Sequence, residues 1–294
     1  MKKILTAIVL LSVTLMLAAC GSSDSKDSKA SEKNQLETIK NKGKVVIGFA
    51  NEKPYAYQEG DELKGAAVDI AKAVFQELGV DEVEGKLADF SQLIPGLKAG
   101  KFDVITAGMA ITPDRCRSVA FGEPEMTYGE GLIVKRGNPK KLHSYEDIAN
   151  NKDIKVSVMS GATENGFLKE IGVDAKQIQA ASDIPATFSA VESGRADATT
   201  GTEMTIKMAL ESANSDKLEF VEDFKQPKVE GNPSYGAAAF KKGSDDLRKA
   251  YNEKLQELKD NGTVAKLLEQ NGFSEKSNMV ADDITTEKVC SGNF

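Results

Sequence analysis

Arg115 is the side chain in this sequence best suited to hold a carboxylate group. It stands two residues after Pro113, and Thr112 before that proline is a predicted N-cap, so a short helix is expected to begin here. A strand is expected just before this helix, and ligands of α/β proteins bind at the carboxyl ends of strands. The planar guanidinium group offers a fork of donors that matches a carboxylate. We predict a ligand-binding arginine; the alternative is a surface arginine paired with Asp114 or Glu123.

Two aromatic residues and one acid also lie after the carboxyl ends of expected strands, as Arg115 does. Tyr55 and Phe90 each follow an expected strand at its carboxyl end, and Glu52 stands shortly before Tyr55. An aromatic residue after a strand is often part of the core, and a loop glutamate is often simply solvated. Two aromatic rings near an arginine instead favour a binding site, where ring faces attract a cation and the glutamate supplies the opposite charge.

The start of a later helix is a further candidate. Thr163 is expected to open this helix after Gly161, and free backbone N–H groups there could bind the other side of a carboxylate. Simple helix capping is the alternative.

The composition excludes several classes of protein. The 294-residue chain has 38 basic and 45 acidic residues and a net charge of −7, so it offers no overall positive field for nucleic acid. A single histidine, His143, and three cysteines are too few for the common zinc sites and leave little room for a catalytic triad. With 40% hydrophobic residues, one large or two medium globular domains are expected. We expect no metal, no cofactor, no catalytic residue and no nucleic-acid partner.

The first residues read as an export signal. Lys2 and Lys3 precede an apolar run over 4–19, which is shorter than the about 20 residues that span a bilayer. A pair of small residues directly before Cys20 resembles the bacterial lipobox, in which this cysteine is lipidated and becomes the first mature residue; a plain secretory signal is the alternative. We therefore expect a lipoprotein signal peptide at 1–19 and a flexible tether at 20–35.

Cys116 and Cys290 remain once Cys20 is assigned to the lipid. An exported compartment permits a disulfide between them, and we favour this bridge over two free thiols. It would tie the tail of the chain to its first third.

Short β-branched runs alternate with helical periods in two series, which predicts parallel sheets with helices on both faces. The first series has strands at 45–49, 83–87 and 102–106, with helices ending near 78 and opening at 91. The second series has strands at 155–159, 178–181 and 196–200, with helices at 163–171 and 183–193.

Two extended segments, 128–135 and 235–241, are expected to cross between these series. Amphipathic helices at 244–261 and 263–271 then return to the first series if Cys290 bonds to Cys116. We therefore predict an α/β fold of two lobes joined by a two-strand hinge, and hinged lobes usually close on a ligand. Lobe 1 is predicted at 36–131 and 238–294, and lobe 2 at 132–237.

Three motifs carry a resemblance to a known family. The sequence has GAAVDI at 65–70, LIPGLKAGKFD at 93–103 and TPDR at 112–115. They resemble the polar-amino-acid type of substrate-binding proteins of ABC importers, over about residues 36–271. The resemblance implies a two-lobed periplasmic-binding-protein-like fold of type II. It also implies a lipid-anchored monomer on the extracytoplasmic face of the cell membrane, which delivers solute to permease subunits with a separate ATPase.

Within that family, segments 50–55, 113–116 and 286–290 look most like the ectoine and hydroxyectoine binders, and the cysteine placement is the most specific of these features. The resemblance implies that Arg115 holds the ligand carboxylate and that the aromatic residues sandwich a small zwitterionic solute. The predicted ligand-binding residues are Glu52, Tyr55, Phe90, Gly108, Ala110, Arg115, Gly161, Thr163 and Thr202.

Two departures leave the ligand open. Amino-acid binders of the family usually carry threonine or serine where Ala110 stands. They also carry an aspartate, which holds the α-ammonium group of the ligand, where Thr202 stands. Glu203 could replace that aspartate if the strand ended in a bulge. Ectoine-type binders tend to have a third aromatic residue at the place of Ala110. The alternatives are a binder of glutamine-, arginine- or cystine-like amino acids, a cyclohexadienyl-type dehydratase with Glu52 or Glu203 as general acid, and a signalling or adhesion module.

Overall fold

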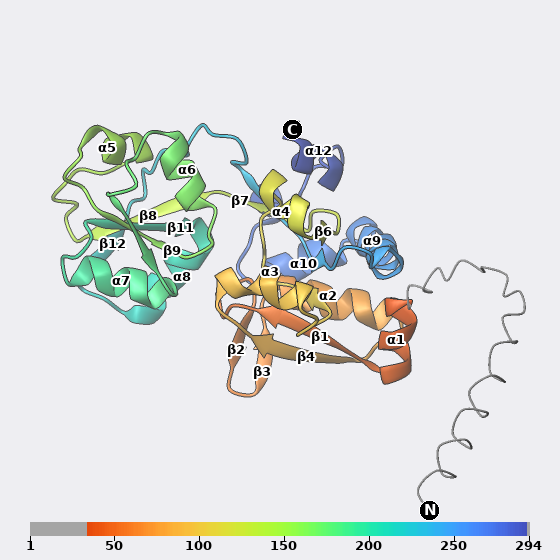
Figure 1. Ribbon diagram of the computed structural model, residues 1–294. Helices are drawn as coiled ribbons and strands as arrows, with labels where there is room; N and C mark the ends of the chain where they lie inside the picture. Colours follow the sequence, from red (N-terminus) through yellow and green to blue (C-terminus); the bar gives the residue numbers. More distant parts are fainter. Residues whose placement is uncertain (1–33, 293–294) are drawn as a thin grey trace, which may run out of the picture. The chain divides into compact units, whose positions relative to one another are not determined.

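The computed structural model of the protein describes residues 34–292 (Figure 1). The predicted signal peptide, Cys20 and the tether up to residue 33 lie outside the described residues. The first helix, α1 (Gln35–Lys42), is capped by the Asn34 side chain, which accepts a hydrogen bond from the Glu37 backbone N–H. Gln35, the last residue of the predicted tether, belongs to this helix.

The first sheet is mixed and has the strand order β4-β1-β5-β14-β6. β1 pairs in parallel with β4 and β5, as the predicted first series requires, whereas β14 runs antiparallel to both of its neighbours. Strand β5 is shorter than the predicted 102–106, and the Phe102 ring lies over Gly48 and Gly96 before the strand begins. The strands are β1 (Lys44–Phe49), β4 (Glu82–Leu87), β5 (Val104–Ile105), β6 (Ala120–Phe121) and β14 (Ala239–Phe240), and the connecting helices are α2 (Ala66–Glu77) and α3 (Phe90–Lys98).

The second sheet repeats this plan in the order β10-β9-β11-β8-β12. β9 pairs in parallel with β10 and β11, and β8 pairs antiparallel with β11 and β12. Strand β11 ends two residues beyond the predicted 196–200. The strands are β8 (Glu130–Lys135), β9 (Val156–Met159), β10 (Ile178–Ala181), β11 (Ala198–Thr202) and β12 (Leu218–Phe220), and the helices are α5 (Tyr145–Asn150), α6 (Glu164–Glu170), α7 (Ile184–Glu192) and α8 (Glu203–Ala213).

Each sheet has apolar side chains on both faces, as expected for parallel strands covered by helices. In β8, Leu132 and Val134 pack in one buried cluster with residues of α5 and α6, while Ile133 packs in another with residues of α7 and α8. In β1, Ile47 packs with α2, while Val46 contacts the cluster that contains α3. We call the parts built on the first and second sheets lobe 1 and lobe 2.

Two short antiparallel strands lie where the chain passes between the lobes. β7 (Met126–Tyr128) leads into β8 of lobe 2, and β13 (Ser234–Gly236) leads back to β14 of lobe 1. They pair with each other, with Tyr128 opposite Ser234. The predicted boundary between residues 131 and 132 falls inside β8.

The C-terminal helices pack on lobe 1. Tyr251 of α9 makes edge-on contacts with Phe75 and Phe240, with ring centroids 5.7 and 5.3 Å apart. These helices are α9 (Asp245–Asp260), α10 (Thr263–Gln270), α11 (Glu275–Asn278) and α12 (Thr286–Ser291). A small hairpin, β2 (Tyr57–Glu59) and β3 (Glu62–Lys64), precedes α2, and α4 (Pro113–Ser118) precedes β6.

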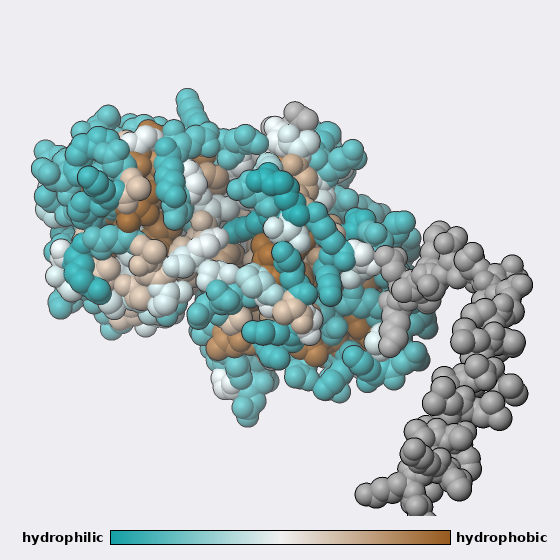
Figure 2. All heavy atoms as spheres, in the orientation of Figure 1, coloured by the Kyte–Doolittle hydropathy of each residue, from teal (hydrophilic) through white to brown (hydrophobic). Residues whose placement is uncertain are grey.

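Figure 2 shows a mostly hydrophilic face with smaller groups of hydrophobic residues between the charged ones. Among residues 34–292, no helix is both long and apolar enough to span a membrane.

Candidate ligand-binding pocket

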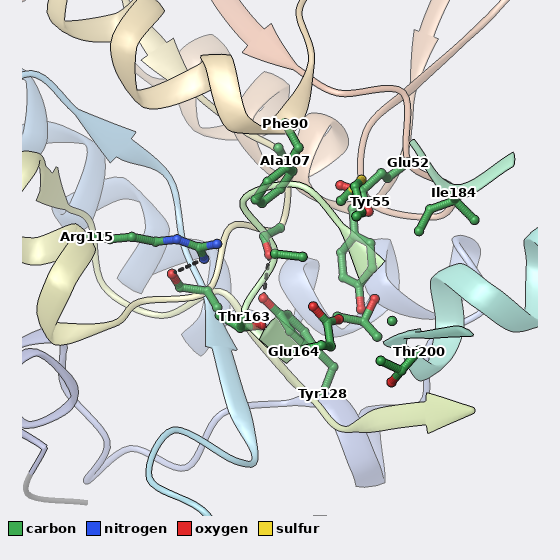
Figure 3. Close-up of a pocket in the computed structure, with 16 residues that line it drawn as sticks. Glu52, Tyr55, Phe90, Ala107, Arg115, Tyr128, Thr163, Glu164, Ile184 and Thr200 are labelled. Carbon is green, nitrogen blue, oxygen red and sulfur yellow. Dashed lines mark hydrogen bonds between the residues drawn. The ribbon is translucent and has the colours of Figure 1, made fainter. Parts of the chain in front are cut away.

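A pocket brings together side chains of both lobes (Figure 3). Every predicted ligand-binding residue lines it except Gly161, whose carbonyl contacts the pocket arginine instead. The lining residues are Glu52, Tyr55, Phe90, Ala107, Gly108, Ala110, Arg115, Tyr128, Met159, Ala162, Thr163, Glu164, Ile184, Thr200, Gly201 and Thr202.

Arg115 lies in the first turn of α4, and its backbone N–H is capped by the Thr112 hydroxyl at 3.2 Å. Its guanidinium donates from Nη1 to the Ala110 carbonyl and from Nη2 to the Gly161 carbonyl, both at 2.8 Å. Asp114 pairs with Arg117 rather than with Arg115, and within residues 34–292 Arg115 forms no ion pair. Because an arginine has five N–H donors, donors remain for a ligand carboxylate.

Tyr55 belongs to the core and to the pocket at once. Its ring is 2% exposed and contacts Tyr128 and Phe273 edge-on, with centroids 5.2 and 5.3 Å away. Gly108 has φ +59°, and a Cβ atom there would lie 2.3 Å from the Tyr55 ring, so only glycine allows this packing. The Tyr128 hydroxyl donates to the Gly108 carbonyl, which fixes the loop.

Phe90 is the first residue of α3, one residue before the predicted helix start at Ser91. Its ring centroid lies 5.4 Å from the Arg115 guanidinium carbon, within reach of a cation–π contact. The aromatic ring therefore supports the arginine from one side.

Glu52 places a carboxyl group on the same pocket. It lies in a tight turn after β1, where its backbone pairs with that of Ala56. Burial, with repulsion from Glu164, raises the pKa of Glu52 to about 8, although Arg115 opposes the shift.

The sequence profile of the bacterial extracellular solute-binding proteins, family 3, matches residues 45–274. The chain belongs to this family. Its two lobes form the two-lobed periplasmic-binding-protein fold that the sequence predicted.

Relatives and solved structures of the family resemble the whole folded part. A probable amino-acid ABC transporter periplasmic-binding protein of Sinorhizobium fredii, y4tE, is 38% identical over 261 residues, covering 87% of this chain and 86% of that protein. The ABC transporter glutamine-binding protein GlnH of Bacillus subtilis is 32% identical and covers 89% and 94%. The crystal structure of EhuB in complex with hydroxyectoine has a TM-score of 0.80 at 35% identity and covers 87% of this chain and 98% of that chain.

Two buried acids at or directly behind the pocket were not predicted from the sequence. Glu164 is the first residue of α6, is 2% exposed and lines the pocket. Glu130 is 1% exposed and lies opposite Thr202 in the antiparallel pair of β8 and β11. A signal for Glu164 was available, since it directly follows Thr163; Glu130 looked like an ordinary polar residue at the start of a strand.

Two helix starts beside the pocket bear on the alternatives left open by the sequence. Thr163 occupies the N-cap position of α6 but its side chain makes no capping hydrogen bond, so simple capping does not account for it. Glu203 begins α8 and pairs with Lys207 at 2.8 Å. It does not line the pocket, because β11 reaches Thr202 in regular register instead of ending in a bulge.

Cys116 and Cys290 form a disulfide with 5.9 Å between their Cα atoms. The bond joins α4 to α12, so the tail is held to the helix that carries Arg115. Among residues 34–292, no group of three or more His, Cys, Asp or Glu side chains is placed to hold a metal ion.

Proposed function

We propose that the protein is the extracytoplasmic solute-binding component of an ABC importer and captures a small zwitterionic solute, with ectoine or hydroxyectoine favoured. The solute would be delivered to permease subunits that work with a separate ATPase, and the protein itself would catalyse no reaction. The observation that carries the proposal is the convergence of Arg115, Phe90, Tyr55 and Glu52 on one pocket.

The chemistry of these side chains matches a compact zwitterion. The Arg115 guanidinium is suited to a carboxylate, and the rings of Phe90 and Tyr55 offer faces to a delocalised cation. The names of relatives support an importer, and the hydroxyectoine complex of EhuB supports the favoured ligand.

A polar amino acid is the second candidate. The 32% identity to a glutamine-binding protein favours it, and no third aromatic ring occupies the position of Ala110. Against it stands Thr202, a neutral residue where the resemblance leads us to expect an aspartate for the α-ammonium group. An ammonium group buried without a partner costs several kcal/mol.

Calorimetric titration of the purified protein with ectoine, hydroxyectoine, glutamine, arginine and cystine tests the choice. We expect ectoine to bind at least about tenfold more tightly than glutamine, a difference of about 1.4 kcal/mol. Micromolar binding of an amino acid without any binding of ectoine would contradict the favoured ligand.

We propose further that lipid on Cys20 anchors the protein to the membrane as a monomer. Metabolic labelling with a fatty acid should mark the wild-type protein and fail for Cys20→Ala. Labelling that persists in this variant would refute the anchor.

A further inference from the structure

The pocket is lined by the carboxyl group of Glu164, which forms no ion pair within residues 34–292. Glu164 is 2% exposed, and its Oε2 atom is buried without a hydrogen-bond donor among the described residues. Backbone N–H groups of Glu164 and Thr202 interact favourably with the same carboxylate and hold it in place. Figure 3 draws Glu164 at the pocket near Thr200, with Tyr55 extending toward it. The Glu164 side chain lines the pocket, so its carboxylate can meet a bound solute.

Glu130 lies behind Glu164, outside the pocket lining. If Glu130 is taken as ionised, neither of its side-chain oxygen atoms has a hydrogen-bond donor within residues 34–292. The two side chains interact directly, and a shared proton gives the missing hydrogen bond. Burial raises the pKa of both groups. Glu164 raises the pKa of Glu130 further, whereas the hydrogen bond from Glu130 lowers the pKa of Glu164, so the shared proton stays on Glu130. The pair therefore carries one negative charge.

The surroundings set the total charge of the pocket. The titratable and charged groups around the pair are Arg115 from α4, Glu52 from the turn after β1, Tyr55, Tyr128 from β7 and Tyr145 from α5. Burial raises the pKa of the three tyrosines, so they stay neutral. With Glu52 mostly protonated at pH 7, one positive charge on Arg115 and one negative charge on the pair remain.

A neutral zwitterion matches this balance better than a net cation or a net anion. Its carboxylate would take the free donors of Arg115, and its cationic nitrogen would pair with the Glu164 carboxylate, which lines the pocket while Glu130 satisfies it from behind. Arg115 itself does not pair with Glu164, because its hydrogen bonds go to the Ala110 and Gly161 carbonyl groups. We propose that Glu164, with Glu130 sharing a proton behind it, is the subsite that holds the cationic nitrogen of the bound zwitterion. This inference rests on the proposed function and names the residue that selects the cationic end of the solute.

Paired titrations of the full chain test the subsite. One probe is the zwitterion that binds wild-type protein most tightly, with ectoine as first choice. The other probe is pyroglutamate, a cyclic carboxylate without a cationic nitrogen. Glu164→Gln keeps the size of the side chain and removes its charge, so we expect at least a tenfold loss of zwitterion affinity and no more than a threefold change for pyroglutamate. A purely structural role would weaken both probes together.

Two further variants test whether the effect belongs to Glu164 and not to Glu130 or to the nearby Glu203. Glu130→Gln imitates the protonated partner, so zwitterion affinity should stay within threefold of wild type. Glu203→Gln is the matched control, because Glu203 directly follows Thr202 but pairs with Lys207 outside the pocket. It should change neither probe.

The outcomes are distinguishable. Unchanged zwitterion binding by Glu164→Gln overturns the inference, and so does a result in which Glu52→Gln alone removes the preference for the zwitterion. If Glu164→Gln is too unstable to titrate, Glu164→Asp keeps the charge on a shorter side chain, and full loss of its preference would count against the subsite. If wild-type protein binds no zwitterion at all, the proposed function fails and this inference fails with it.

Discussion

The Arg115 guanidinium donates a 2.8 Å hydrogen bond from Nη2 to the Gly161 carbonyl oxygen, although 46 residues separate the two along the chain. Gly161 lies in the loop between β9 and α6 with φ +86°, and a Cβ atom there would lie 3.0 Å from the Ser91 Cα atom of α3. A larger residue would push this loop away from α3. The arginine of lobe 1 is thereby held against the backbone of lobe 2 at the edge of the pocket.

Arg115→Ala should reduce ligand affinity by at least about 100-fold, since it removes a half-buried carboxylate clamp worth roughly 3 kcal/mol once the ligand covers it. Arg117→Ala is the matched control, because Arg117 lies on the same helix but pairs with Asp114 at the surface. Calorimetry on both variants checks the prediction. Equal affinities would show that the clamp lies elsewhere.

Phe90→Ala should weaken binding of a delocalised cation by about 1 to 2 kcal/mol. Phe90→Leu should lose less affinity than Phe90→Ala, because leucine keeps the apolar contact and lacks only the ring face. Phe90 is the better test of the aromatic contribution than Tyr55, because Tyr55 also packs against Tyr128 and Phe273. Thermal melts should show Tyr55→Ala to be less stable than Phe90→Ala. If Phe90→Leu binds as wild type does, the ring contributes only packing.

Much of the fold followed from local periodicity. The parallel strands next to β1 and β9 were predicted because short β-branched runs alternate with amphipathic helices along the chain. This alternation is typical of parallel sheets. Helix α8 was not predicted, since Thr205 and Ile206 are its only buried residues and give it little amphipathic pattern. Arg115, Tyr55 and Phe90 could be found because each stands at or near the carboxyl end of a strand.

The buried acid Glu130 could not be found in the same way. Glu130 is buried only because β8 pairs with β11, and this contact joins residues far apart in the sequence. A glutamate at the start of a strand normally marks a solvated edge, so its local signal points away from the site. Long-range pairing and the shared proton with Glu164 are properties of the folded chain alone.

The disulfide should stabilise the protein without shaping the pocket. Reduction, or the double variant Cys116→Ser/Cys290→Ser, should lower the melting temperature, since a loop of 174 residues corresponds to at most about 5 kcal/mol of chain entropy. Ligand affinity should change less than about threefold, because Arg115 keeps its bonds to Ala110 and Gly161. A peptide map of unreduced protein should contain one linked pair. Two thiols that react with an alkylating agent in native protein would contradict the bridge.

Glu125 is a buried acid outside the pocket lining and should make stability depend on pH. It is 1% exposed and accepts a 2.7 Å hydrogen bond from the Tyr251 hydroxyl. Burial raises the pKa of Glu125 to about 7, while Tyr251 and the Lys259 ammonium oppose the shift. The folded protein therefore holds this proton up to a higher pH than the unfolded chain does.

The sign of the effect follows from that difference. The contribution of Glu125 to stability is complete below its ordinary pKa of about 4.5, and it is lost as pH rises through about 7. The loss is at most about 3 kcal/mol, because each pKa unit corresponds to about 1.4 kcal/mol. Glu125→Gln cannot ionise and still accepts the Tyr251 bond, so its free energy of unfolding should fall less than that of wild type between pH 5 and about 8. Denaturant titrations at several pH values measure this, with Glu253→Gln, an exposed position on the same helix as Tyr251, as the control. Parallel pH curves for wild type and Glu125→Gln would mean that Glu125 is already ionised in the folded protein and stabilised by Lys259.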